Sequence, residues 1–351
     1  EATKIGIEIL EIGGNAIDAA IGVQLALAVC LPSAGNIGGG GFMVYRDKTG
    51  DHYSLDFRET APLNSNKNMY LDSNGFVVDS LSTYGGLAVG VPGTIDGIFK
   101  AHKRFGSVHI DTLFNYAIKL ANNGFPITQK QAEKFNFYQN DFTKFNTQNQ
   151  YLQKSHWNKG DILIQEDLAN TLTIIKEKGR SGFYEGEVAQ SLIATIKENG
   201  IITLEDLKNY QAVWREPITY RFGKYQLIGM PPPSSGGIAI SQLLMSLAHF
   251  DINTIKHNSI EYIHLLSEIE KLVYADRAKY LGDPNYYYVP LNELTDYNYN
   301  KHRVKNINLL QASSSNSISE GSFNPKESEE TTHFSIVDKF GNAVSVTTTL
   351  N

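Results

Sequence analysis

Cysteine is nearly absent from this sequence, which has only Cys30 among its 351 residues. A single cysteine excludes any disulfide within the chain. Cys30 lies near the end of an apolar run at residues 16–31, which predicts a small buried side chain rather than a reactive thiol. The run is short for a membrane span and contains Asp18 and Gln24, so it predicts a buried helix. We expect no membrane-spanning segment.

Runs of basic residues and metal-binding patterns are also missing. The formal net charge is -6 and the chain has no Lys/Arg run, which argues against a nucleic-acid partner. The nine histidines include no H-E-x-x-H pattern, and no second cysteine is available for a Cys/His site. We therefore expect no metal and no cofactor.

Two stretches rich in small residues lack the spacing of phosphate-binding or nucleophile motifs. The glycines at 35–41 are not followed by the Lys-Ser/Thr of a P-loop, and a G-x-G-x-x-G register begun at Gly38 reaches Met43. We interpret them as a tight turn that lets the backbone pack closely before a strand at 42–46. Residues 231–237 contain no G-x-S-x-G elbow, and their prolines and small residues predict a stiff approach to a helix.

The remaining patterns predict an α+β protein. Helical spacing appears over residues 1–14, at Leu168, Leu172 and Ile175 before Gly179, and over 263–273, while Thr203 to Asp206 has the form of a capping box. Strand patterns occupy 42–46 and 53–57, and a hairpin is predicted from 218–222 and 225–230 across Gly223. No linker precedes residue 311, so we expect one domain. We also expect segments beyond both ends, because residue 1 opens inside a helix and Asn351 directly follows a strand.

The most informative feature is the change of pattern at Thr331. Residues 311–330 offer only Ala312, Ile318 and Phe323 as apolar groups, which predicts a mobile tether. Two alternating runs then follow, separated by the turn-forming residues 338–342. A hairpin symmetric about Phe340 places Thr331 opposite Thr349.

This junction predicts a self-cleavage site between Glu330 and Thr331. A threonine that becomes a chain terminus carries its own general base, because its α-amine has a reference pKa of about 7.7–8.0. No neighbouring histidine is then needed to activate the hydroxyl. The alternative from these residues alone is that Thr331 and Thr332 merely open a strand.

Seven other blocks support the first interpretation, and all of them occur in family order. With the junction, the chain resembles the γ-glutamyltranspeptidases, which are N-terminal-nucleophile hydrolases cut from one precursor. The resemblance implies an αββα four-layer sandwich, with a large subunit at 1–330 and the first hairpin of the small subunit at 331–351. The blocks are EIGGNAIDAA at 11–20, GNIGGGGFM at 35–43, DFRE at 56–59, GVPGT at 90–94, PPPSSGG at 231–237, YADR at 274–277 and LGDP at 281–284.

The resemblance also implies the site and the reaction. Arg58, which alternation places on the strand face of Ser54 and Asp56, would hold the α-carboxylate of a γ-glutamyl group through its planar fork. Asn351 would contact the α-amino acid end. Thr331 would attack the γ-amide of glutathione or a related compound, and water or an amino-acid or peptide acceptor would take the acyl group.

The resemblance implies three further features of the protein. Thr349 would hold the Thr331 hydroxyl, while Thr332 or His333 would position the strand. The oxyanion-hole amides would lie downstream of residue 351. The large subunit would remain associated with its own small subunit in the periplasm or outside the cell.

Two rival interpretations remain from the sequence. One is a cephalosporin-acylase-like amidase on the same scaffold, against which Arg58 argues, because an acyl group without an α-carboxylate has less use for it. The other is a non-catalytic binding protein in which Thr331 never becomes a terminus. The joint presence of Thr331, Thr349 and Arg58 argues against the second rival.

Overall fold

The computed structural model describes residues 1–145, 154–196, 200–318 and 331–350. The chain divides into two compact units, the first formed by Glu1–Thr49, Leu55–Val213 and Ser328–Asn351 and the second by Gly50–Ser54 and Trp214–Glu327. This division differs from the single domain expected from the sequence. Three boundaries fall in a turn at Gly50 and in strands near Leu55 and Trp214, where the sequence predicts no linker, and the fourth falls between Glu327 and Ser328, within the predicted tether.

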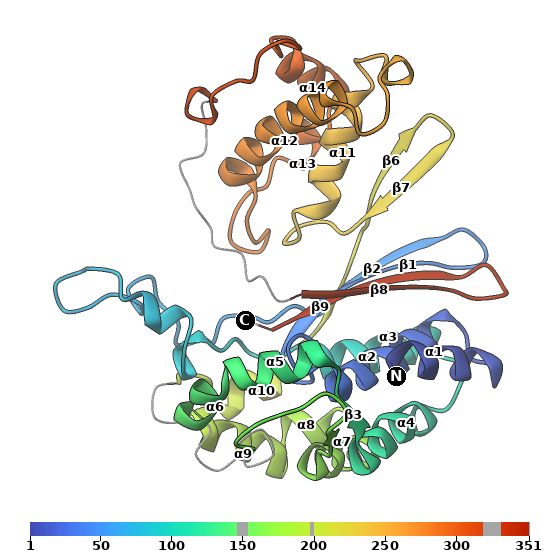
Figure 1. The fold of residues 1–351 in the computed structure, drawn as a ribbon, viewed down its shortest axis with the longest axis vertical. Coiled ribbons are helices and arrows are strands. Elements are labelled where there is room, and N and C mark those ends of the chain that lie inside the picture. Colours follow the sequence, from blue (N-terminus) through green and yellow to red (C-terminus); the bar gives the residue numbers. More distant parts are fainter. Residues whose placement is uncertain (146–153, 197–199, 319–330, 351) are drawn as a thin grey trace. The chain divides into compact units, whose positions relative to one another are not determined.

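A five-stranded sheet joins strands that are far apart in the sequence (Figure 1). Its order is β5-β2-β1-β9-β8, and β9 pairs antiparallel with both β1 and β8. The strand predictions at 42–46 and 53–57 are confirmed with slightly shifted ends. The strands are β1 (Gly40–Arg46), β2 (His52–Asp56), β5 (Val213–Arg215), β8 (Thr331–Val337) and β9 (Ala343–Thr349).

Helix α2 (Ala16–Cys30) is the centre of the first unit, and the predicted buried helix is confirmed. It contacts β8 and β9 as well as α1 (Ala2–Glu11), α3 (Thr94–Phe105) and α4 (Ile110–Asn123). Figure 1 shows α1, α2 and α3 on one face of the strands. A helix with neighbours on every side needs apolar residues all round, which explains why α2 lacks an amphipathic pattern.

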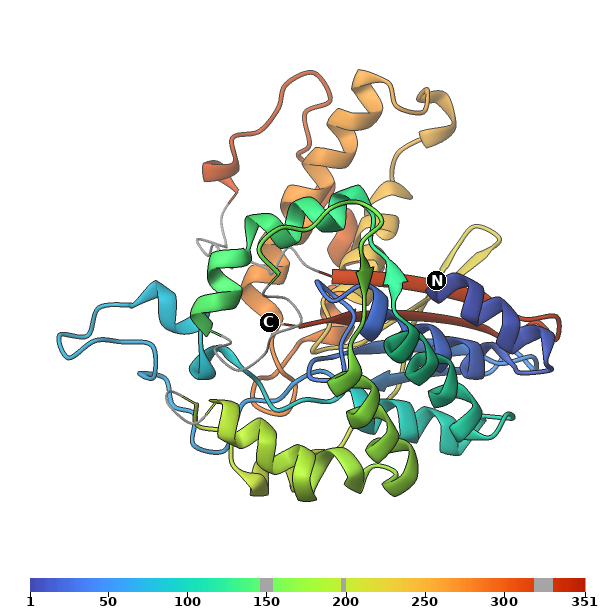
Figure 2. The ribbon, with the colours of Figure 1, turned by 60° about the horizontal axis from the view of Figure 1, so that its bottom comes forward.

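A later helix of the first unit packs against α4. Helix α7 (Glu166–Lys178) contacts α4 and ends at Gly179 as predicted, and the Thr203–Asp206 capping box opens α10 (Leu204–Asn209). Figure 2 shows the short antiparallel pair β3 (Phe125–Pro126) and β4 (Ile162–Leu163). The remaining elements are η1 (Asp79–Ser82), η2 (Gly86–Ala88), α5 (Gln129–Phe137), α6 (Gln139–Phe145), α8 (Ser181–Tyr184) and α9 (Gly186–Ile196).

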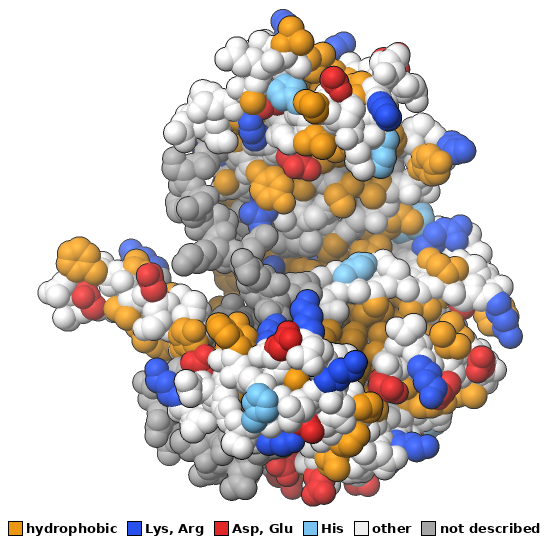
Figure 3. Space-filling view, viewed as in Figure 1, with side chains coloured by type: hydrophobic (Ala, Val, Ile, Leu, Met, Phe, Trp, Pro, Cys, Tyr) orange, Lys and Arg blue, Asp and Glu red, His pale blue; other side chains and the backbone are white. Residues whose placement is uncertain are grey.

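Residues 61–90 of the first unit extend away from the helices as an irregular segment. An isolated bridge joins Leu71 to Val77 within it, and another joins Thr60 to Val91 at its base. Several of its apolar side chains are exposed, and Figure 3 shows hydrophobic groups at its tip, on the left of the view. The exposed apolar side chains of the whole segment include Leu63, Phe76, Val77 and Tyr84.

The second unit combines a hairpin with a helical cluster. The predicted hairpin is confirmed as β6 (Ile218–Phe222) and β7 (Tyr225–Gly229), and the predicted helix over 263–273 lies within α12 (Ile260–Tyr280). Asp276 of α12 is buried and accepts hydrogen bonds from Gln242 and Tyr299, at 3.0 and 2.9 Å, on two other helices. The other elements are α11 (Gly236–Leu247), η3 (Ile252–Thr254), α13 (Leu291–Leu294), α14 (Tyr297–Val304) and η4 (Ser315–Ser317).

The predicted tether begins within the second unit. The backbone N–H of Ser313 donates to Glu268, and its carbonyl accepts from Lys271, so the first residues of the tether contact α12. Residues 319–330 lie outside the described ranges.

Two further expectations concern Cys30 and membrane spans. Cys30 is half-buried, and this burial raises the pKa of its thiol, which makes it a poor nucleophile. Across the part of the chain that the structure describes, no helix combines the length and apolar character needed to cross a membrane.

Candidate active site

The hairpin at 331–349 has the register that the sequence predicted. Thr331 pairs with Thr349, and the pairing continues without a bulge to Val337 and Ala343. On β9 the side chains of Val344, Val346 and Thr348 are buried, whereas Ser345, Thr347 and Thr349 on the other face are half-buried. Because directly paired residues share a face, Thr331 belongs to the face of Thr349.

The turn of this hairpin is fixed by Asp338 and Asn342. Asp338 accepts hydrogen bonds from the backbone N–H of Phe340 and Asn342, from the Asn342 side chain, and from the N–H of Ala16 at the start of α2, all within 3.0 Å. Asn342 Oδ1 accepts from Tyr45 and from the N–H of Lys48, at 3.2 and 2.7 Å. The turn is thereby tied to both α2 and the end of β1.

The carboxylate of Asp338 makes the stability of this region dependent on pH. Burial opposes ionisation, but the hydrogen bonds from Asn342, Ala16 and Phe340 outweigh it and lower the pKa of Asp338. A carboxyl with a lowered pKa stabilises the fold above its unfolded pKa of about 3.9, and this contribution is lost as the pH falls through its folded pKa.

We therefore expect Asp338→Asn to lower the Tm of the full-length protein by about 2–4 °C at pH 7, because charge-assisted hydrogen bonds become neutral or are lost. The difference from wild type should shrink as the pH falls below about 3.9. Scanning calorimetry from pH 3 to 7 measures both effects, with Asp79→Asn as an exposed control. A Tm difference that is constant with pH would contradict this account.

Asn36 is a buried side chain at the other end of the hairpin, and no sequence pattern indicated its role. Its Nδ2 donates to the carbonyl of Thr349 at 2.9 Å and to Thr348 Oγ1 at 3.1 Å. Its Oδ1 accepts from the N–H of Gly39 at 2.8 Å and from Thr94 Oγ1 at 2.7 Å. One amide therefore joins the end of β9, the glycine loop and the start of α3.

The glycine loop packs as closely as the sequence predicted. A Cβ added at Gly39 would collide with the carbonyl of Thr349, and one at Gly41 with the carbonyl of Thr347. These contacts are with backbone atoms of β9, which cannot move aside without breaking the sheet. The interpretation as a close-packing turn is confirmed.

Arg58 lies at the same level of the sheet as Thr331. Phe57 exchanges hydrogen bonds of 3.0 and 3.3 Å with Gly41, so the next residue, Arg58, lies beside Gly40, which pairs with Thr349. Four residues therefore form a row across the sheet, in the order Arg58, Gly40, Thr349 and Thr331. The row spans three strand spacings, so the backbones of Arg58 and Thr331 are roughly 14 Å apart. An extended arginine side chain and a γ-glutamyl group together can span such a distance.

The surroundings of Arg58 leave its guanidinium accessible. Arg58 is exposed, and its guanidinium lies 5.8 Å from the centroid of the Phe42 ring. Its backbone N–H donates to Asp56 at 3.0 Å.

Glu59, next to Arg58, is a carboxylate that sequence reasoning did not select. Its buried Oε1 has no hydrogen-bond partner among the described residues. Burial raises the pKa of Glu59, although its own backbone N–H, the charge of Arg58 and the N–H of Gly40 oppose the shift. A perturbed carboxyl beside a candidate binding residue is typical of functional sites.

A row of polar side chains continues from Thr331 along its face. His333 Nδ1 lies 2.8 Å from Thr347 Oγ1, and Ser335 Oγ lies 2.8 Å from Ser345 Oγ. His333 is therefore engaged with the neighbouring strand, whereas Thr332 is half-buried on the opposite face. The positioning role of Thr332 and His333 stays a prediction.

Several predicted features cannot be described at this site. Glu330, Asn351 and the side chain of Thr331 lie outside the described residues. Among the residues that are described, no group of three or more His, Cys, Asp or Glu side chains is arranged to hold a metal ion.

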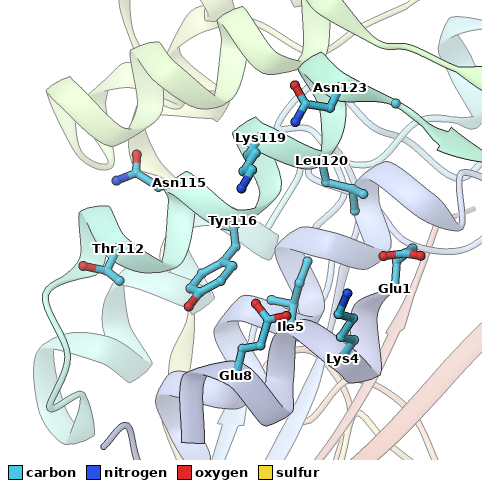
Figure 4. Close-up of a pocket in the computed structure, with 11 residues that line it drawn as sticks. Glu1, Lys4, Ile5, Glu8, Thr112, Asn115, Tyr116, Lys119, Leu120 and Asn123 are labelled. Atoms are coloured by element: carbon cyan, nitrogen blue, oxygen red, sulfur yellow. The ribbon is translucent and has the colours of Figure 1, made fainter. Parts of the chain in front are cut away.

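A cavity of about 400 Å³ lies elsewhere in the first unit, between α1 and α4. Figure 4 shows Lys4 and Glu8 on one wall and Tyr116 and Lys119 on the other. None of the candidate site residues lines this cavity. It is therefore separate from the row that contains Thr331 and Arg58.

Comparison with solved structures defines the class of protein. A crystal structure of γ-glutamyltranspeptidase from Helicobacter pylori superposes with a TM-score of 0.89 at 41% identity, covering 93% of this chain and 95% of that one. The chain thus has the α+β fold of the N-terminal-nucleophile hydrolases, and the predicted fold class is confirmed. The γ-glutamyltranspeptidase family model matches residues 2–351, and the chain belongs to that family.

Curated relatives are longer than this chain. The glutathione hydrolase proenzyme of Pseudomonas aeruginosa is 45% identical over 353 residues, which cover 99% of this chain and 62% of that protein. The acylase ACY 1 proenzyme of Pseudomonas sp. (strain SE83) is 34% identical over 359 residues, covering 100% of this chain and 64% of that protein.

Proposed function

We propose that the whole protein is a self-processing γ-glutamyl hydrolase and transferase that acts on glutathione and related compounds. The observation that carries the proposal is the row formed by Thr331, Thr349 and Arg58 in a chain of the γ-glutamyltranspeptidase family. The candidate nucleophile and the candidate carboxylate-binding residue lie at one level of the sheet, three strand spacings apart. A threonine that merely opened a strand would not require this partner.

The first reaction is cleavage of the precursor. Thr331 Oγ attacks the carbonyl carbon of Glu330, and the peptide nitrogen leaves to become the α-amine of Thr331, so an amide is exchanged for an ester. Water then hydrolyses the ester and releases the carboxylate of Glu330. Residues 1–330 form the large subunit, and the chain from Thr331 onward begins the small subunit.

The second reaction is turnover at the new terminus. The α-amine of Thr331 takes the proton from its own hydroxyl, whose oxygen attacks the γ-amide carbon of the donor. The proton passes to the leaving amine, and a γ-glutamyl ester of Thr331 remains. Water, an amino acid or a peptide then takes the acyl group, and the Thr331 hydroxyl is restored.

Three groups bind or orient the reactants in this proposal. Arg58 pairs with the donor α-carboxylate through two parallel hydrogen bonds. Asn351 contacts the α-amino acid end of the donor. Thr349 holds the Thr331 hydroxyl in line with the amide carbon. No cofactor or metal takes part.

The two subunits remain together after cleavage, and we propose a periplasmic or extracellular location for the protein. This part of the proposal rests on family membership alone. Fractionation of the source cells, with the γ-glutamyl activity as marker, tests it directly.

The experiment that tests the function compares two amide classes on the full-length protein. A γ-glutamyl anilide should be turned over with glutathione as a competitor, whereas a cephalosporin side-chain amide should be a poor substrate. Preference for the cephalosporin amide would assign the protein to the acylase relatives instead. Failure to cut at Glu330–Thr331, followed by intact mass, would favour the non-catalytic rival.

A further inference from the structure

Asn36 has no role in the proposed reaction so far, yet it contacts the candidate site directly. It lies in the loop between α2 and β1 and is 5% exposed. Its Nδ2 donates to the carbonyls of Ala34 and Thr349 and to Thr348 Oγ1, and its Oδ1 accepts from Gly39 and Thr94. Both polar atoms are thus fully engaged within the protein, so Asn36 is not placed to bind a substrate.

These contacts hold the last residue of β9. Thr349 pairs with Gly40 on one side and Thr331 on the other, and among the described residues no further pair follows it in either ladder. The terminal pair of a ladder has neighbours on only one side, so other contacts must restrain it. The bond from Asn36 to the Thr349 carbonyl supplies such a restraint.

The residues that hydrogen-bond to Asn36 are themselves held by other contacts. Gly39, whose N–H donates to Asn36, accepts through its carbonyl from the N–H groups of Gly93 and Thr94 at 2.8 and 3.1 Å. Thr94 is fully buried at the first position of α3. The carbonyl of Thr349 is therefore connected through Asn36 to the beginning of a helix.

We propose that Asn36 is a positioning residue for the proposed γ-glutamyl transfer, which holds Thr349 so that its hydroxyl stays opposite Thr331. The inference rests on the proposed function. It adds to the proposed site a residue that acts through Thr349 and does not contact the donor. Arg58 holds the donor from another strand, so loss of Asn36 affects the chemical step more than donor binding.

The expected kinetic result follows from this division of roles. Asn36→Leu, which keeps the size of the side chain, should lower kcat for γ-glutamyl anilide hydrolysis about 10- to 100-fold, because small displacements of reacting groups have effects of this order. KM should stay within about twofold of wild type, because carboxylate binding through Arg58 is unchanged.

A double-mutant cycle separates positioning from general destabilisation. If Asn36 acts through Thr349, then Asn36→Leu should change kcat less than about twofold in a Thr349→Ala background, since coupled residues are not additive. Equal effects in the two backgrounds would overturn the inference while leaving the proposed function intact.

Three further variants control for misfolding and indirect effects. Thr94→Val removes one bond to Asn36 and should lower kcat in the same coupled way by a smaller factor, whereas Thr94→Ser keeps the hydroxyl and should restore it. Asn300→Leu is the matched control, because Asn300 is 1% exposed in the second unit and donates to Leu294 and Asp296. It should lower Tm without lowering kcat.

The wild-type protein distinguishes failure of the inference from failure of the function. If it cuts itself at Glu330–Thr331 but does not act on γ-glutamyl anilides, the substrate assignment is wrong, and the same cycle applied to the cleavage rate decides the role of Asn36. If it neither cuts itself nor turns over the anilide, the function and the inference both fail.

Discussion

Thr331→Ala is expected to leave the chain uncut after Glu330 and to lower γ-glutamyl anilide turnover by at least about 10⁴-fold. Both losses have one cause, because the same hydroxyl oxygen attacks the Glu330 carbonyl in the precursor and the donor amide afterwards. The fold should be retained, since the backbone of β8 remains paired with β9 along its whole length. Intact mass and N-terminal sequencing measure cleavage, and anilide release measures turnover.

Two conservative variants serve as controls for Thr331. Thr331→Ser keeps a hydroxyl and should retain both reactions at a reduced rate. Thr332→Ser alters the adjacent residue on the opposite face and should leave the cleavage position unchanged. Cleavage of Thr331→Ala at the same bond would exclude Thr331 as the attacking group.

Arg58→Gln is expected to lower kcat/KM for γ-glutamyl donors by about 30-fold to several thousand-fold. The range follows from the loss of about 2–5 kcal/mol when one partner of a hydrogen-bonded charge pair is removed. Most of the change should fall on KM, because the α-carboxylate is bound equally in the ground and transition states. Arg58→Lys keeps the charge but loses the planar fork, so it should recover part of the activity.

The specificity of the Arg58 effect can be checked on the donor as well as on the protein. A donor amide that lacks the α-carboxylate should be turned over equally by wild type and Arg58→Gln. Arg221→Gln, at an exposed arginine of β6, is the matched control and should leave all rates unchanged. Unchanged donor kinetics in Arg58→Gln would remove the main argument against the acylase alternative.

The parts of the site that depend on residues close together in the sequence could be predicted from the sequence alone. Turn residues between two alternating runs specify a short hairpin, and symmetry about Phe340 was enough to pair Thr331 with Thr349. The close-packing glycines and the Thr203 capping box were likewise predicted, because each depends on neighbours a few residues away.

The contacts that the sequence did not reveal join distant segments. Asn36 meets Thr348 and Thr349 more than 300 residues further along the chain, and Asp338 meets Ala16 across a separation of 322 residues. A buried asparagine and a turn aspartate are common residues whose partners cannot be chosen from local pattern. The division into two units was missed for the related reason that its boundaries at Gly50, Leu55 and Trp214 have ordinary composition.

The position of β9 determines the order of folding and cutting in the proposed precursor. The proposed cut separates β1, in the amino-terminal piece, from β8 and β9, yet β9 is hydrogen-bonded to β1 along seven residue pairs. A piece ending at residue 330 and made alone would present β1 as an open edge, with Met43 and Tyr45 no longer flanked by Val344 and Val346, and such edges promote aggregation. Folding must therefore come before cutting, and two halves produced from separate genes should assemble poorly compared with the single precursor.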